Sequence, residues 1–235
     1  MERRWLFFVM ELKAIKLFNE LGQEELEEVK RRARVRVYPK GSTVFVGGQE
    51  ADGLYIIMKG RAKVLMLYPD GREKTLAILL EGEVLGEVTL YGSDLRSATV
   101  ETLETTTFLV ISRDSFRILL LAMPRLSFRV IELLSERLRR ANQQIEELTF
   151  LNARSRVISG LIFLAEEHGC AKGKEIHIPF SMTHAELARM VAVSRETVTK
   201  VLNELQSTSC IGMGRGQIKI LSMSGLRRQS SRQCI

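Results

Sequence analysis

Two short groups of residues in the first half of the chain have side chains suited to bind an anion beside a sugar. They are Gly86-Glu87-Val88 and Arg96-Ser97-Ala98, and eight residues separate Glu87 from Arg96. Glycine lets the backbone approach a ligand closely, and a helical turn beginning here would offer free N–H groups to an anion. The Arg96 guanidinium and the Ser97 hydroxyl suit a phosphate, whereas the Glu87 carboxylate accepts a hydrogen bond from a sugar hydroxyl. Together these groups describe a nucleotide site.

The same residues have a second interpretation. Short Gly-Glu motifs occur often by chance, and a surface loop in which Glu87 and Arg96 form an ion pair would need no ligand. The residue types alone leave both interpretations open.

The elements that would position these residues are short strands. Polar and apolar residues alternate, as in a half-buried strand, and Gly or Pro separates the runs. Such spacing predicts a closed β-roll or jelly roll over residues 1–126, with short helices over residues 11–33. The expected strands are 34–38, 43–46, 54–58, 62–68, 75–80, 98–103 and 106–111.

A long amphipathic helix is predicted from about Ser127 to Asn152, just after Pro124. Its apolar stripe has the heptad spacing of a coiled coil, and polar residues flank it. We expect this helix, with the hinge at its end (127–153), to pair with a second copy in a homodimer. The alternative is a helix packed on its own domain. The stripe is Ile131, Leu134, Leu138, Ala141, Ile145, Leu148 and Asn152.

Residues 154–235 contain the signals of a helix-turn-helix. Thr183 begins a capping box, and Ser194 precedes a second helix expected over 195–206. Only 191–193 separate the two helices, and if φ is positive at Ala192 the methyl group costs about 1 kcal/mol. The outward residues of the second helix would face base edges in a major groove, and the alternative is a solvated face. They are Arg195, Glu196, Thr199 and Lys200.

The charge distribution agrees with a DNA-binding end. From residue 154 onward the chain has 12 Lys or Arg against 6 Glu, a net charge of +6, whereas residues 1–153 carry a net charge of +1. A basic surface without a partner would give the same numbers. Residues 211–220 predict a two-stranded wing with Arg215 or Lys219 near a phosphate, and 225–235 predicts a disordered tail.

The spacing of Gly86-Glu87 and Arg96-Ser97-Ala98 resembles the phosphate-binding cassette of the cyclic-AMP receptor protein family, the CRP/FNR regulators. The long helix and the C-terminal domain follow in the same order, so the resemblance covers nearly the whole chain. It implies an α+β fold made of a β-roll cyclic-nucleotide-binding domain, a dimerisation helix and a winged helix-turn-helix. It also implies that Glu87 binds the ribose 2′-hydroxyl, and that Arg96 and Ser97 bind the cyclic phosphate.

The family contacts adenine from two adjacent positions of the long helix, which match Ala141 and Asn142. Asn142 has a donor and an acceptor for a purine edge, whereas Ala141 departs because a methyl group cannot hydrogen-bond. This departure leaves the identity of the effector open. The expected effector-binding residues are therefore Gly86, Glu87, Val88, Arg96, Ser97, Ala141 and Asn142.

In the C-terminal domain, 194–198 match the family's recognition helix, and Lys200 stands where arginine is common. The resemblance implies half-sites close to TGTGA, read as a palindrome by a dimer. The expected DNA-binding residues are Thr183, Ser194, Arg195, Glu196, Thr199 and Lys200.

Several classes of protein fit the sequence poorly. Residues 1–167 lack His and residues 1–169 lack Cys, so the usual haem and iron–sulfur ligands are absent there. Cys170, Cys210 and Cys234 show no metal-ligand or disulfide spacing, and no nucleophile–base pair suggests an enzyme. The apolar run 5–10 is short for a signal peptide, and no stretch reaches the ~18–20 apolar residues of a membrane span. A cytoplasmic protein without a metal, haem or cluster is expected.

The sequence therefore predicts a homodimeric transcription regulator controlled by a small effector, with cyclic AMP as the first candidate. Its expected partners are double-stranded DNA, a second copy of itself and RNA polymerase, with no membrane. One alternative is a regulator of the same family that needs no nucleotide or binds another effector. The alternative from another class is a nucleotide-binding signalling module that does not bind DNA.

Overall fold

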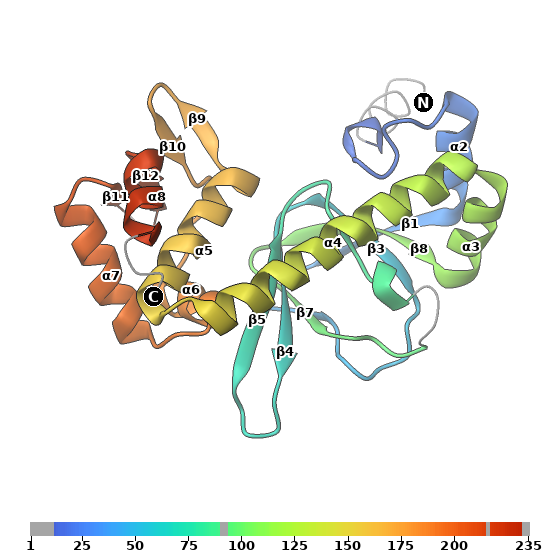
Figure 1. Ribbon diagram of the computed structural model, residues 1–235. Helices are drawn as coiled ribbons and strands as arrows, with labels where there is room; N and C mark the ends of the chain where they lie inside the picture. Colours follow the sequence, from blue (N-terminus) through green and yellow to red (C-terminus); the bar gives the residue numbers. More distant parts are fainter. Residues whose placement is uncertain (1–11, 90–93, 215–216, 232–235) are drawn as a thin grey trace. The chain divides into compact units, whose positions relative to one another are not determined.

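The computed structural model describes residues 12–89, 94–214 and 217–231. The chain divides into two compact units, Met1–Arg139 and Arg140–Ile235. Helix α4 (Pro124–Phe150) belongs in part to each. The succession of strands, a long helix and a helical domain confirms the predicted α+β fold (Figure 1). None of the helices in the described ranges is long and apolar enough to span a membrane.

Two antiparallel four-stranded sheets form the roll of the first unit. One has the strand order β1-β8-β3-β6, and the other has the order β2-β7-β4-β5. All the expected strands are present within one or two residues, whereas the two-residue strand β6 was not predicted. The strands are β1 (Ala33–Tyr38), β2 (Thr43–Phe45), β3 (Gly53–Lys59), β4 (Ala62–Leu67), β5 (Glu73–Leu79), β6 (Val84–Leu85), β7 (Thr99–Thr102) and β8 (Thr106–Ser112).

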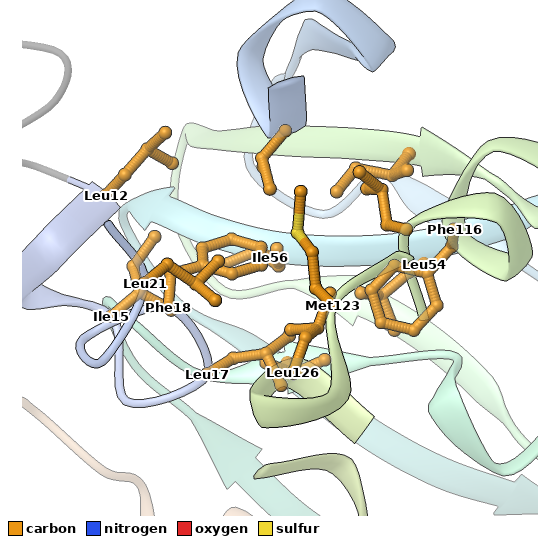
Figure 2. Packing of buried hydrophobic residues seen from close by; sticks show 14 of the residues in the cluster. Leu12, Ile15, Leu17, Phe18, Leu21, Leu54, Ile56, Phe116, Met123 and Leu126 are labelled. Carbon is orange, nitrogen blue, oxygen red and sulfur yellow. The ribbon is translucent and has the colours of Figure 1, made fainter. Parts of the chain in front are cut away.

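Strand β3 is buried on both faces and therefore joins two apolar cores. Tyr55 and Ile57 pack between the sheets with residues of β4, β7 and β8. Leu54 and Ile56 point the other way, because successive side chains of a strand alternate. They pack with α2 (Gln23–Arg32), α3 (Arg113–Ala122), the start of α4 and the N-terminal segment from Leu12, as Figure 2 shows.

Strand β1 differs from its expected half-buried pattern. Its apolar residues Val35 and Val37 are 57% and 60% exposed, and the residues around them are exposed as well. Strand β1 is an edge strand that pairs only with β8, and the side chains of residues 34–37 are left uncovered on both of its faces. Alternation alone predicts two faces, but it cannot tell whether another layer covers one of them.

The ends of the long helix also differ from the prediction. Helix α4 begins at Pro124, where the missing proline N–H costs nothing. It ends at Phe150, so Asn152 is not part of the apolar stripe. The Asn152 side chain instead accepts a hydrogen bond from the Ser155 amide and caps the next helix.

The second unit combines four helices with a four-stranded sheet of order β11-β12-β10-β9. The predicted disordered tail is wrong over 225–231, because this segment belongs to a helix whose Leu226 is fully buried. Arg215 and residues 232–235, including Cys234, lie outside the described residues. The elements are α5 (Ala153–His168), β9 (Cys170–Lys172), β10 (Glu175–His177), α6 (His184–Val191), α7 (Arg195–Ser207), β11 (Ile211–Gly214), β12 (Gln217–Ile220) and α8 (Met223–Ser231).

Helices α6 and α7 form the predicted helix-turn-helix. Thr183 and Glu186 make both hydrogen bonds of the capping box, and the Ser194 side chain accepts from the Thr197 amide at 3.1 Å. Between the helices, Ala192 has φ 53° and ψ 52°, which is the left-handed conformation. A Cβ atom is strained there, so the turn tolerates alanine at a cost.

We expect Ala192→Gly to stabilise the protein by about 1 kcal/mol, since glycine adopts a positive φ without that strain. Urea unfolding followed by circular dichroism measures the change. Ala185→Gly is the matched control, because it lies inside α6, where glycine costs roughly 0.5–1 kcal/mol. A destabilised Ala192→Gly variant would contradict the assigned strain.

Candidate effector site and DNA interface

Glu87 begins a single turn of 3-10 helix, Glu87–Thr89, and only 3% of the residue is exposed. Its Oε1 atom lies 3.0 Å from Nη1 of Arg137, which comes from α4. Arg137 also donates to the carbonyl oxygen of Val84, so it ties α4 to the strand just before the cassette. Burial raises the pKa of the Glu87 carboxyl, and the charges of Arg137 and Arg96 oppose this shift.

Arg96 is equally buried, at 3% exposure, although it belongs to a loop. Its Nη2 atom donates to Oδ1 of Asp52 at 2.5 Å and to the carbonyl oxygen of Gly53 at 2.8 Å. The guanidinium carbon lies 4.0 Å from the centre of the Phe45 ring, a cation–π contact. An ion pair, a backbone carbonyl and an aromatic face therefore hold the guanidinium in one position.

Gly86 makes room for this arginine. Its φ is +87°, and a Cβ atom there would collide with Nη1 of Arg96 and lie 2.8 Å from the carbonyl oxygen of Gly53. A side chain at this position would therefore displace the guanidinium as well as strain the backbone. The sequence predicts a close approach of the backbone to a ligand, and the structure adds a close approach to Arg96.

Four buried polar atoms of the site have no hydrogen-bond partner within the described ranges. They are both carboxylate oxygens of Glu87, of which Oε1 makes only the ion pair with Arg137, and Nε and Nη1 of Arg96. Leaving a buried polar group unsatisfied costs about 1–3 kcal/mol, so such groups call for an explanation. Acceptors on Glu87 suit a hydroxyl donor, and donors on Arg96 suit an anion. These are the two chemical groups that the sequence assigned to a nucleotide.

The interpretation of the cassette as a surface loop with a Glu87–Arg96 ion pair is wrong. Both residues are buried, and Glu87 pairs with Arg137 whereas Arg96 pairs with Asp52. Val88 and Ser97 are exposed next to them.

Ala141 and Asn142 are exposed residues of the part of α4 that belongs to the second unit. Their contact with an effector stays a prediction.

Two charged residues of the site were not predicted from the sequence. Arg137 is one of the polar residues that flank the apolar stripe of the long helix, but its side chain is only 31% exposed and reaches Glu87. Asp52 gave no signal, because it precedes Arg96 by 44 residues and adjoins it only through folding.

The candidate DNA interface is the N-terminal half of α7. Val198, Val201, Leu202 and Leu205 are buried, whereas Arg195, Glu196 and Lys200 are exposed. Thr199 is partly buried, and its hydroxyl donates to the carbonyl oxygen of Arg195 and lies 2.8 Å from Nδ1 of His184. The two exposed cations and Glu196 therefore present their polar groups outward, while Thr199 is already hydrogen-bonded inside the protein.

Glu196 has a structural explanation besides base reading. Hydrogen bonds from its own backbone amide and from the Ser194 side chain lower the pKa of its carboxyl. A carboxylate in the first turn of a helix is also favoured by the helix dipole. Its presence on a DNA-facing helix is thus not unfavourable in itself, and only a binding experiment separates the two roles.

Within the described ranges, no group of three or more His, Cys, Asp and Glu residues is placed to hold a metal ion. Cys170 is an exposed free thiol and Cys210 a buried one.

Two family models match the chain. Residues 35–122 match the cyclic nucleotide-binding domain, and residues 155–229 match the Crp-like helix-turn-helix domain. The cyclic AMP receptor protein of Thermus thermophilus is 31% identical over 209 residues, which cover 89% of this chain and 94% of that protein. A CRP-like cAMP-activated global transcriptional regulator of Mycobacterium tuberculosis is 32% identical over 193 residues, covering 82% and 86%.

A solved structure of the c-di-GMP responsive global regulator CLP of Xanthomonas campestris has a TM-score of 0.73 and 25% identity, covering 86% of this chain and 100% of that one. A cyclic nucleotide-binding domain and a Crp-like helix-turn-helix in one chain define a DNA-binding transcription regulator. The chain belongs to the CRP/FNR family of these regulators.

The raised pKa of Glu87 predicts a pH dependence of stability. When a carboxyl has a higher pKa in the folded protein than in the unfolded chain, the folded state binds more protons in the interval between the two values. Stability should then fall as pH rises from the ordinary pKa of a glutamate to the raised value, because ionisation leaves a buried charge.

We expect Glu87→Gln to remove this dependence and to stabilise the ligand-free protein more at pH 7.5 than at pH 5. Thermal unfolding of both proteins over a pH series measures it. Glu24→Gln, an exposed residue of α2, is the control for a lost surface charge. Parallel pH profiles for the wild type and Glu87→Gln would contradict the shift.

Proposed function

We propose that this chain is a homodimeric transcription regulator whose β-roll binds cyclic AMP and whose paired α7 helices read a palindromic, TGTGA-like site. The observation that carries the proposal is the burial of Glu87 and Arg96, whose carboxylate oxygens and two of whose guanidinium nitrogens have no hydrogen bond within the described residues and match a ribose hydroxyl and a phosphate. The similarity to cyclic AMP receptor proteins supports the choice of effector.

Each residue of the cassette takes one role in this proposal. Glu87 accepts a hydrogen bond from the ribose 2′-hydroxyl, and Arg96 and Ser97 bind the cyclic phosphate. Gly86 and Val88 supply the close backbone approach and the helical turn. Asn142, beside Ala141, hydrogen-bonds the purine.

The homodimer is proposed on the exposed apolar stripe of α4. Ile131, Leu134 and Leu138 are 57%, 38% and 63% exposed in the first unit, and Ile145 and Leu148 are 63% and 45% exposed in the second. Apolar residues at heptad spacing are rarely left in water along a helix, and a second helix would cover them. A twofold dimer would also pair two recognition helices about one DNA turn apart.

On the DNA, the proposed contacts come from α6 and α7. Arg195, Glu196 and Lys200 meet base edges or phosphates, and Thr183 and Ser194 lie at the N-termini of the two helices, where backbone amides suit a phosphate. Thr199 contacts the groove through its methyl group, since its hydroxyl is occupied. RNA polymerase is the proposed further partner, and the cytoplasm the proposed compartment.

A second effector is favoured by one observation. Ala141 replaces a hydrogen-bonding residue of the family's adenine contact, and the similar regulator from Xanthomonas campestris is described as responsive to c-di-GMP. Both effectors are phosphodiesters, so both suit Arg96. Calorimetric titrations with cyclic AMP, cyclic GMP and c-di-GMP separate them, and a regulator that needs no nucleotide would bind none.

Arg96→Lys tests the effector site while retaining the positive charge. Lysine is a point charge that cannot reproduce the planar set of donors, so we expect the affinity for cyclic AMP to fall about 10–100-fold. Isothermal calorimetry measures it, and Arg72→Lys, on the exposed β4–β5 turn, is the control. An unchanged affinity in Arg96→Lys would refute the assigned phosphate site.

Glu196→Ala and Lys200→Ala test the DNA interface. If Glu196 reads a base, its removal should relax the preference at one position of each half-site, with a discrimination of about 1–3 kcal/mol lost there. Lys200→Ala should weaken binding to all sequences and lower the salt slope by about one. Fluorescence anisotropy with a palindromic duplex and its single-base variants measures both, with Glu24→Ala as the control. An unchanged preference would leave Glu196 with only its helix-capping role.

A further inference from the structure

Asp52 is a charged residue of the effector site for which the proposed function has no role. Its Oδ1 atom accepts from Nη2 of Arg96 at 2.5 Å, and its Oδ2 atom accepts from the hydroxyl of Tyr55 at 2.8 Å. Tyr55 is only 2% exposed and belongs to the core between the two sheets. Asp52 is thus fixed through both oxygens, one on the buried arginine and one on the buried tyrosine.

The charges of the site cancel in two pairs. Glu87 pairs with Arg137, and Asp52 pairs with Arg96. A carboxylate on the arginine that is meant for a phosphate weakens the attraction for any anion. It weakens the attraction for a doubly charged anion twice as much, because the repulsion scales with the charge of the ligand.

We infer that Asp52 is a specificity-determining residue that makes the roll select a singly charged phosphodiester over a doubly charged phosphate monoester. This inference rests on the proposed function of the roll as a nucleotide site. Cyclic AMP carries one negative charge, whereas 5′-AMP carries nearly two above pH 7, because the second pKa of a phosphate monoester is about 6. Both nucleotides have the same base and a ribose 2′-hydroxyl, so charge is a main difference between them.

The surroundings limit how strong this selection is. The Asp52 side chain is 51% exposed, and Nη1 of Arg36 lies 3.8 Å from its Oδ2 atom. Water and the Arg36 charge both screen the carboxylate. Removing Arg36 should therefore sharpen the selection, whereas removing the Asp52 charge should weaken it.

The experiment measures the ratio of the affinities for 5′-AMP and cyclic AMP at pH 8 and low ionic strength, by displacement of a fluorescent cyclic AMP analogue. Asp52→Asn keeps an oxygen that accepts from Arg96 and removes the charge. We expect the affinity for 5′-AMP relative to that for cyclic AMP to rise about tenfold in this variant. Arg36→Gln should lower the affinity for 5′-AMP relative to that for cyclic AMP.

Asp70→Asn is a closely matched control. The Asp70 side chain is also 51% exposed and pairs with an arginine, Arg72, at 2.7 Å, but it lies on the turn between β4 and β5. This variant should leave the ratio unchanged. The shift of the ratio in Asp52→Asn should shrink as the salt concentration rises from 50 mM to 500 mM, because salt screens the repulsion that this substitution removes.

The outcomes separate the inference from the proposed function. If the wild type binds cyclic AMP but Asp52→Asn shows no relative gain for 5′-AMP, or that gain does not shrink with salt, the inference is overturned and the effector site stands. A change of ratio in Asp70→Asn equal to that in Asp52→Asn would overturn it as well, since the effect would then be general. If the wild type binds neither nucleotide, the proposed function fails and the inference fails with it.

Discussion

The site depends on the burial of two opposite charges that do not neutralise each other. Glu87 and Arg96 are each 3% exposed, and each pairs with a different residue, Arg137 and Asp52. Burial of a charge is costly unless partners compensate it, and compensation is incomplete here because polar atoms of both residues lack hydrogen bonds to the residues that the structure describes. A protein that keeps such groups pays in stability for a site that a suitable ligand completes.

The strands of the roll make this burial possible. Tyr55 of β3 points into the core between the sheets, where its ring packs edge-on against Phe108 and at a tilt against Phe45, and its hydroxyl donates a hydrogen bond to Asp52. The carbonyl of Gly53, the first residue of the same strand, accepts from Arg96. Strand β3 therefore has two roles. Its alternating side chains contribute to both apolar cores, and the Tyr55 hydroxyl and the Gly53 carbonyl help to hold the Arg96 guanidinium in place.

Local signals in the sequence were enough to predict the elements and the cassette itself. Alternation and turn residues place the strands, the capping box of Thr183 places α6, and the spacing of Glu87 and Arg96 indicates the ligand chemistry. Partners distant in sequence could not be predicted, because whether Asp52 meets Arg96 depends on how loops 44 residues apart pack. The helix at 223–231 was missed for a related reason: polar composition suggested disorder, but the burial of Leu226 stabilises it.

Arg137 connects the chemistry of the cassette to the helix proposed for dimerisation. It contacts Glu87 and the Val84 carbonyl, while its neighbours Leu134 and Leu138 on α4 are exposed. A hydroxyl that binds Glu87 must share the carboxylate with Arg137, so the free energy of binding depends on where α4 lies. By linkage, an effector could move α4 only if it bound one position of that helix more tightly than another. A ligand that contacted Arg96 but not Glu87 would bind the roll without affecting the Glu87–Arg137 ion pair. It could therefore not move α4 through that ion pair.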